Sequence, residues 1–208
     1  MQKGLFLSLE GGEGAGKSTQ HRHIIEWFKA QGRDVVETRE PGGTPISEQI
    51  RQLLLDTRNA GLNSVAELLL LFAARAQLLQ EVIRPALAEG KVVISDRFTD
   101  ASYAYQGGGR EMGSEAVSRI EALVHPDLQP DMTLLFDVPV EQGMARVAGR
   151  GEADRFEVES LLFFERVRNA YLQRAADNPE RFVVIDASDA EDKVWASIQN
   201  TLEQRFLQ

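Results

Sequence analysis

The sequence predicts a three-layer α/β domain in which a parallel five-stranded sheet is covered by helices on both faces. Three observations support this prediction. Apolar runs of strand length alternate with segments of helical character along the 208-residue chain. The run from Lys91 to Asp96 is almost continuously apolar, as expected for a strand buried inside a parallel sheet. The first apolar run leads into GxxxxGKS at Gly11 to Ser18, a glycine-rich sequence that commonly joins a strand to a helix.

Five short segments have strand character. Each is rich in β-branched or other large apolar residues and is bounded by glycine, proline or charged residues. They are residues 5–9, 34–40, 91–96, 132–138 and 182–186.

The segments between them show helical periodicity or capping signals. Gly32 can end the first helix, Thr44 before a proline is typical of an N-cap, and Asn63 can cap the third helix. That third helix is apolar on so many sides that we expect more than the sheet to cover it, which indicates a subunit interface. Pro85 is expected to kink it and Gly90 to end it. The predicted helices are 17–31, 45–58, 64–89, 114–124, 140–148, 157–177 and a last amphipathic helix ending near 206.

Two segments are predicted to be loops. Gly107 to Gly109 places three glycines in succession. Residues 149–155 are polar and charged and have no periodicity, so we expect them to be exposed.

The composition limits the possible functions. The length suits a single domain spanning residues 1–208. A net charge of −9 argues against a nucleic acid partner, and the absence of cysteine excludes disulfides and thiolate metal sites. The longest apolar run, Leu68 to Ala74, is too short to span a membrane, and the first residues do not resemble a signal peptide, so a cytoplasmic protein is expected.

The GxxxxGKS segment predicts a nucleotide phosphate site. Its glycines let successive backbone N–H groups point at one anion, and the following helix directs its positive dipole end towards the phosphates. Lys17 is expected to reach the β and γ phosphates, and the Ser18 hydroxyl to bind Mg²⁺. The predicted nucleotide-binding residues are Gly11, Gly12, Glu13, Gly14, Ala15, Gly16, Lys17, Ser18 and Thr19.

Two further pairs suggest ligand contacts. Asp96, at the end of a buried strand, can hold Mg²⁺ beside Ser18, while Arg97 follows next to the phosphate loop. Phe72 and Arg75 share one face of the third helix, which suits a flat ligand with a polar edge. By itself this second pair more often indicates a core aromatic and an arginine that extends to solvent.

Several motifs in order along nearly the whole chain together resemble bacterial thymidylate kinase, a family of phosphate-loop (P-loop) kinases. The matching segments are 10–19, Thr-Arg-Glu-Pro-Gly-Gly-Thr at 38–44, Phe72-Ala-Ala-Arg75, Asp96-Arg97-Phe98, Ser102 with Tyr105-Gln106-Gly107, and Arg150-Gly151-Glu152 with Arg155. The resemblance implies phosphorylation of dTMP to dTDP with ATP and Mg²⁺ in dTTP biosynthesis, by a single P-loop kinase domain that forms a homodimer. It also implies a short lid insertion at about residues 146–158.

The resemblance assigns a role to each predicted substrate residue. Phe72 would stack on thymine, and Tyr105 would pack where a ribose 2′-hydroxyl would otherwise fit. Glu13 would accept the sugar 3′-hydroxyl, and Arg97 would hold the dTMP phosphate with help from Arg51. The polar edges of thymine would be contacted by Arg75, Ser102 and Gln106.

The variable positions of the phosphate loop lack an arginine, although other members of the family carry one there. Positive charge on the transferring group must then come from elsewhere, and in the related enzymes a lid arginine closes over ATP. Arg150 is the first candidate here, Arg155 the second and Arg146 the weakest. Together with Lys17 and Arg97, such an arginine would stabilise in-line transfer.

Three alternatives differ in substrate or class. A kinase of another nucleotide or of a deoxynucleoside would share the fold and differ in its acceptor. A GTPase switch usually carries an Asn-Lys-x-Asp signature for guanine, and no such string occurs here. A structural protein with a relic nucleotide site would not be expected to keep Lys17, Ser18 and Asp96 together.

Overall fold

The computed structural model describes residues 3–148 and 154–207, and its centre is a parallel five-stranded sheet with the strand order β2-β3-β1-β4-β5. The strands are β1 (Leu5–Gly11), β2 (Val35–Arg39), β3 (Val92–Asp96), β4 (Met132–Asp137) and β5 (Phe182–Asp186). All five were predicted within a few residues. The chain first builds the sheet on one side of β1 and then on the other, so the carboxyl end of β1 is the point where a ligand crevice is expected.

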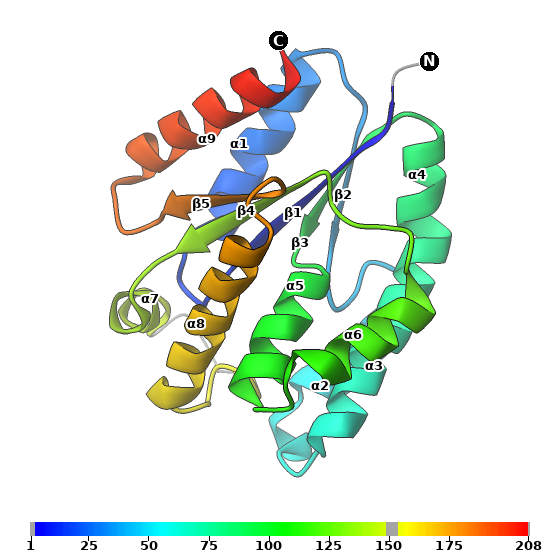
Figure 1. Ribbon diagram of the computed structural model, residues 1–208, viewed down its shortest axis with the longest axis vertical. Helices are drawn as coiled ribbons and strands as arrows, with labels where there is room; N and C mark the ends of the chain where they lie inside the picture. The colour runs from blue at the N-terminus through cyan, green and yellow to red at the C-terminus, as the bar shows by residue number, and fades with distance from the viewer. Residues whose placement is uncertain (1–2, 149–153, 208) are drawn as a thin grey trace.

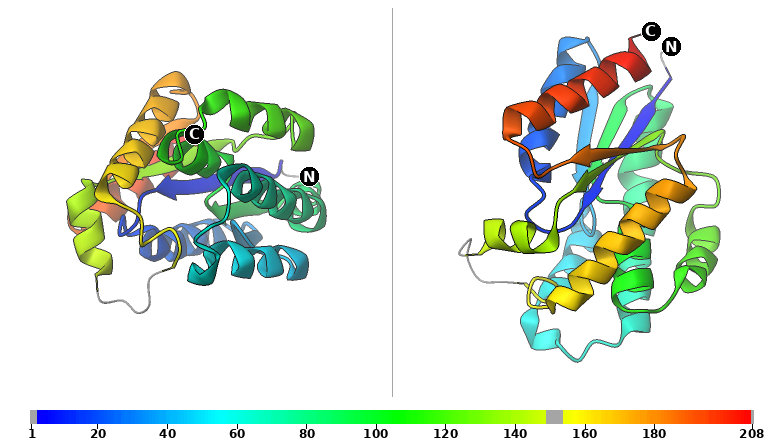
Figure 2. Two further views of the ribbon diagram at one scale, coloured as in Figure 1. Left: turned by 90° about the horizontal axis from the view of Figure 1, so that it is seen from below. Right: turned by 60° about the vertical axis from the view of Figure 1, so that its left-hand side comes forward.

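Helices cover both faces of the sheet, which confirms the predicted architecture (Figures 1 and 2). Alternate residues of β1 make the two cores: Leu7 and Leu9 pack with α1 and α9, whereas Phe6 packs with the end of α3 and the turns after it. The helices with eight or more residues are α1 (Lys17–Ala30), α2 (Pro45–Leu55), α3 (Ser64–Leu78), α6 (Ser114–Val124), α7 (Val140–Val147), α8 (Leu161–Asp177) and α9 (Glu191–Phe206).

The predicted caps of α2 and α3 are confirmed. The Thr44 hydroxyl accepts from the Ser47 N–H, and the Asn63 side chain accepts from the Val65 N–H. The long apolar helix continues from α3 through a π-helical turn, η2 (Leu79–Ile83), into α4 (Arg84–Ala88). The backbone hydrogen-bond pattern of the helix therefore changes in the turn that precedes Pro85. None of the helices in the described ranges combines the length and the apolar character needed to cross a membrane.

Two predicted boundaries are wrong. The second helix ends at Leu55 and is followed by a separate 3₁₀ turn, η1 (Thr57–Asn59), which the Asp56 side chain caps at the Arg58 N–H. The helix predicted from residue 157 begins at Leu161, because Ser160 caps it through the Phe163 N–H.

The loop predicted at Gly107 to Gly109 is also wrong. These glycines belong to a π-helical segment, η3 (Tyr103–Gly109), that continues α5 (Thr99–Ser102) and packs against α8. A Cβ atom on Gly108 would lie 2.6 Å from the Cβ of Ala170, and one on Gly109 would lie 2.5 Å from the Phe163 ring. The glycines therefore permit close packing of two helical segments rather than a flexible loop.

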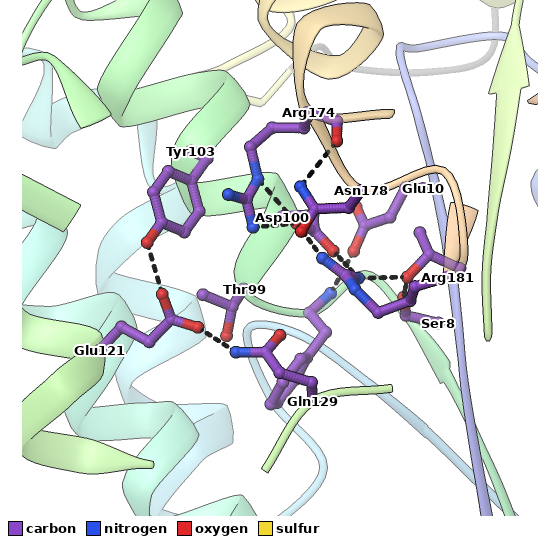
Figure 3. Close-up of polar contacts among 12 residues, drawn as sticks. Ser8, Glu10, Thr99, Asp100, Tyr103, Glu121, Gln129, Arg174, Asn178 and Arg181 are labelled. Carbon is purple, nitrogen blue, oxygen red and sulfur yellow. Dashed lines mark hydrogen bonds and ion pairs between the residues drawn. The ribbon is translucent and has the colours of Figure 1, made fainter. Parts of the chain in front are cut away.

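A buried ion network fastens α5 and α8 to the sheet (Figure 3). The fully buried Asp100 accepts hydrogen bonds from Arg174 at 2.8 and 3.0 Å and from Arg181 at 2.6 and 3.1 Å. Arg181 also donates to Thr133 of β4, which shares a hydrogen bond with Ser8 of β1. Because both arginines are hydrogen-bonded to Asp100, the network ties α5 and α8 to the segment that precedes β5.

Candidate active site

The phosphate loop connects β1 to α1 and has backbone conformations that glycine favours. Gly11, Gly14 and Gly16 have φ angles of 138°, 69° and 79°. A Cβ atom on Gly14 would lie 2.0 Å from the carbonyl oxygen of Gly143 in α7, so this glycine also permits the contact between the loop and α7. The loop is therefore shaped by both its own backbone and the helix behind it.

Lys17 is held inside this loop. Its Nζ donates to the carbonyl oxygens of Gly11 at 3.0 Å and Gly12 at 2.9 Å. Burial and the nearby Arg97 together lower its pKa to about 8, although the charge of Glu13 opposes them. A lysine restrained in this way can reach a phosphate seated in the loop with little loss of side-chain entropy.

A cavity of about 710 Å³ opens at the carboxyl ends of the strands beside this loop. It joins the phosphate loop to the residues predicted to bind the acceptor. Of the predicted site residues its wall contains Glu13, Gly14, Ala15, Gly16, Lys17, Ser18, Thr19, Arg51, Arg75, Asp96, Arg97, Ser102, Tyr105 and Gln106.

Arg97 and Glu13 form the centre of the pocket. The guanidinium donates to Glu13 Oε1 at 2.7 Å and to the Gly11 carbonyl at 2.8 Å, and the Tyr105 hydroxyl donates to the same Glu13 oxygen at 2.8 Å. Burial raises the pKa of Glu13, but Arg97 and Lys17 outweigh it, so the net pKa is lowered. Arg97 has a φ of 71°, a left-handed conformation that is unusual for a residue with a side chain.

Asp96 fits the predicted metal site. Its Oδ1 is buried and has no hydrogen-bond partner among the described residues, and it lies in the same pocket wall as Ser18. The described residues contain no cluster of three or more acidic, His or Cys side chains that could hold a metal. Mg²⁺ needs no such cluster, since it commonly binds through one or two carboxylates together with water and substrate phosphates.

Arg75 is a buried residue of the pocket wall. Its Nε donates to Glu40 Oε2 at 2.7 Å and its Nη2 donates to the Ser102 hydroxyl at 3.0 Å. The guanidinium carbon lies 4.3 Å from the centroid of the Phe72 ring, and the His125 ring lies nearly parallel to that ring at 6.1 Å. Phe72 is therefore covered, only 2 % exposed, and does not form part of the pocket wall.

The structure corrects the prediction that Arg155 is exposed. Arg155 is 4 % exposed and donates to the Leu54 carbonyl at 2.7 Å and to Glu67 Oε2 at 2.6 Å. The guanidinium also lies over the Phe156 ring. Its charge is thus paired inside the protein, away from the pocket wall, while Arg150 lies outside the described residues.

Arg146 connects two parts of the nucleotide end of the site. It donates to the Gly14 carbonyl at 3.3 Å and to the Ala187 carbonyl at 2.8 Å. Ala187 begins the loop after β5, so this arginine joins that loop to the phosphate loop.

Sequence reasoning missed two buried carboxylates that organise the pocket. Glu10 accepts from the Phe98 N–H at 2.7 Å and from the Tyr171 hydroxyl at 2.8 Å. Glu67 accepts from Arg155 and also from Gln106. The signal for Glu10 was a single acid within an otherwise apolar strand, whereas the partners of Glu67 lie too far along the chain for any local pattern to show.

Comparisons with known proteins agree with this geometry. A family model described as thymidylate kinase matches residues 9–198. The chain is 57% identical over 199 residues to a thymidylate kinase of Ectopseudomonas mendocina, covering 96% of this chain and 95% of that one. It is 56% identical to one from Pseudomonas fluorescens, with the same coverage. The crystal structure of thymidylate kinase from Ehrlichia chaffeensis superposes with a TM-score of 0.79 at 32% identity, covering 97% of this chain and 99% of that chain.

Glu10 makes the stability depend on pH. Burial, together with the like charge of Asp100, raises its pKa from 4.5 to about 8, so between these values the folded state binds a proton that the unfolded state has lost. The free energy of unfolding should therefore fall as pH rises from about 5 to 8, by an amount on the order of a few kcal/mol. We expect Glu10→Gln, which cannot titrate, to show a shallower fall in urea denaturation at pH 5, 6, 7 and 8.

The matched control for this measurement is Glu26→Gln, which removes an exposed carboxylate from α1. It should keep the wild-type dependence on pH. Equal slopes for Glu10→Gln and the wild type would show that Glu10 titrates alike in the folded and unfolded states.

Proposed function

The chain belongs to the thymidylate kinase family, which transfers a phosphoryl group from ATP to dTMP to give dTDP, and we propose that its pocket aligns these two substrates for direct in-line transfer. The protein is thus a nucleotide-binding transferase of dTTP biosynthesis, and ATP is its phosphoryl donor. The roles of individual residues, the use of Mg²⁺ and the oligomeric state are the parts that we propose.

The part of the pocket proposed to bind dTMP is identified by two buried polar atoms that lack hydrogen-bond partners among the described residues. Arg75 Nη1 and Gln106 Oε1 are buried in the pocket wall and have no hydrogen-bond partner among the described residues. One is a donor and the other an acceptor, and thymine offers the complementary O4 acceptor and N3–H donor. Since a buried polar atom without a partner costs about 1–3 kcal/mol, both atoms favour a ligand with this edge.

Phe72 keeps its proposed role as the stacking partner of thymine on one condition. The Arg75 guanidinium covers the ring at 4.3 Å. The guanidinium must leave that face before the base can stack there, and the hydrogen bonds of Arg75 to Glu40 and Ser102 would then rearrange.

The sugar and phosphate of dTMP would lie between this end and the phosphate loop. Only Oε1 of Glu13 takes part in the hydrogen bonds between described residues, which leaves Oε2 for the sugar 3′-hydroxyl, with Tyr105 against the sugar. Arg97, Arg51 and Arg39 form part of the same wall. Burial lowers the pKa of Arg51 and the like charge of Arg39 lowers it further, so an anion between the two would relieve repulsion.

The donor end would hold the ATP phosphates on the backbone of the loop and on Lys17. Asp96 and Ser18 would hold Mg²⁺, which when bound neutralises phosphate charge. Because the loop itself carries no arginine between Gly11 and Gly16, we propose that Arg150 supplies the remaining positive charge, and Arg155 is withdrawn from this role because it is paired with Glu67.

The family resemblance and the surface of two helices support a homodimer. Ile46 and Leu53 of α2 are 51% and 43% exposed, and Val65 and Leu69 of α3 are 54% and 52% exposed. These two helices pack on one another, so a second copy of the chain could bury all four side chains together.

A cytoplasmic location is part of the same proposal, since both substrates are cytoplasmic metabolites.

The acceptor assignment is tested with a panel of acceptors in an ADP-release assay. We expect dTMP to give the highest kcat/KM, with dUMP lower by a moderate factor, since one methyl group contributes about 1–3 kcal/mol. Lys17→Ala should fold normally and lose turnover with every acceptor. A preference for thymidine or dCMP over dTMP would contradict the assignment.

The two lid arginines should differ in what their removal changes. Arg150→Ala should lower kcat by roughly a thousandfold with little change in the affinity for dTMP, because the charge acts on the transferring group. Arg155→Ala should instead lower the free energy of unfolding by about 1–3 kcal/mol, because Glu67 loses a buried partner. Steady-state kinetics and urea denaturation of both variants test this difference. A normal kcat for Arg150→Ala would show that Arg150 does not supply the charge on the transferring group.

Sedimentation measurements test the proposed dimer. The wild type should sediment at twice the chain mass of 23.2 kDa, and a Leu53→Asp, Leu69→Asp double variant should move towards the single-chain mass. Leu123→Asp, a change at a leucine of α6 that is 83% exposed, is the control. A monomeric wild type at micromolar concentration would rule out this proposal.

A further inference from the structure

Glu67 of α3 lies behind the nucleobase end of the pocket and has no exposed surface. Its Oε1 accepts from Gln106 Nε2 at 2.7 Å, and its Oε2 accepts from Arg155 Nη2 at 2.6 Å. The Arg110 guanidinium spans both oxygens at 3.3 Å. A carboxylate held between two guanidinium groups can only accept hydrogen bonds, so each group facing it must be a donor.

This requirement decides the orientation of the Gln106 amide. The two ends of an amide have nearly the same shape, and the surrounding hydrogen bonds determine which end lies where. Glu67 takes the nitrogen end. The carbonyl oxygen of Gln106 then lies on the side of the amide away from Glu67. Gln106 is part of the pocket wall, and this oxygen is buried without a hydrogen-bond partner among the described residues.

We propose that Glu67 determines pyrimidine selectivity by holding the Gln106 carbonyl towards the base, so that the pocket takes a ring N3–H and disfavours a ring nitrogen that is itself an acceptor. Thymine and uracil carry N3–H, whereas the N3 of cytosine is an acceptor. The inference rests on the proposed role of Gln106 in reading the base and adds the cause of its orientation. Glu67 is a positioning residue, since it is absent from the pocket wall.

The variant that tests this is Glu67→Gln, which keeps the shape and removes the acceptor-only property. Arg155 should hold the oxygen of the new amide, as it holds Oε2 now, and the new nitrogen would then face Gln106. Gln106 would turn its carbonyl towards that donor and present its nitrogen to the base. We expect the ratio of kcat/KM for dTMP to that for dCMP to fall about 10- to 100-fold.

Two controls separate this effect from a general loss of structure. With dUMP, which shares the N3–H edge, kcat/KM should fall together with that of dTMP, while the KM for ATP stays near its wild-type value. Glu159→Gln removes another partner of Arg110 that makes no contact with Gln106, and it should keep the wild-type ratio. An unchanged ratio in folded Glu67→Gln, with folding checked by circular dichroism, would overturn the inference.

If Glu67→Gln does not fold, the double variant Glu67→Leu, Arg155→Met replaces the buried pair with apolar residues, a change that is often tolerated. It also frees the Gln106 amide, so the same ratio should fall, and a wild-type ratio would again overturn the inference.

Gln106→Leu, measured in parallel, separates this inference from the proposed base-reading role. It leaves Glu67 its two arginines and should lower kcat/KM for dTMP and dUMP alike. If Gln106→Leu changes the ratio and Glu67→Gln does not, only the role of Glu67 is wrong. If Gln106→Leu keeps the wild-type ratio, the base-reading role and the inference fail together.

Discussion

The catalytic pocket depends on the hydrogen bonds that the buried carboxyl group of Glu10 accepts. It lies in β1, one residue before the phosphate loop, and takes its hydrogen bonds from the Phe98 N–H and the Tyr171 hydroxyl. The first bond restrains the backbone directly after Arg97, and the hydroxyl of Tyr171 in turn accepts from the Arg97 side chain at 3.2 Å. Together with the bond from Arg97 N–H to the Leu9 carbonyl, these contacts hold Arg97 in a left-handed conformation that would otherwise be unfavourable.

The same principle extends to the rest of the pocket, where buried carboxylates hold the arginines in place. Glu40 pairs with Arg75, and Glu67 pairs with Arg155. A buried carboxylate without a partner is strongly unfavourable, so Glu40 and Glu67 each keep an arginine beside them. Glu13 differs, because it is part of the pocket wall and keeps one oxygen outside the hydrogen bonds between described residues. The buried acids therefore shape the site, and the accessible acid is the one suited to contact substrate.

Local patterns in the sequence were sufficient for the sheet, most helices and the phosphate loop. Their residues are close along the chain, and apolar periodicity or glycine spacing reports directly on their geometry. Apart from two helix boundaries, the errors occurred where the environment of a residue depends on residues far away in the sequence. Gly108 is required by Ala170, and Arg155 is buried because Glu67 lies opposite it in the folded chain. Similarly, the pattern placed Phe72 and Arg75 on one face but could not show that the guanidinium would cover the ring.

Helix α3 explains how one rigid element can read both polar atoms of a base edge. It carries Arg75, whose unpartnered Nη1 is the proposed donor to the base, and two turns earlier Glu67, which we propose orients the acceptor of Gln106. The segment that carries Gln106 follows Asp96 and Arg97 and packs through its glycines against α8, so its position is set by the same helices that surround the phosphate loop. Arg75 belongs to α3, and Gln106 is hydrogen-bonded to Glu67 of the same helix. A movement of α3 would therefore change both contacts together. In the proposed mode of binding, nucleobase recognition and the alignment of the phosphates thus depend on one set of packed helices.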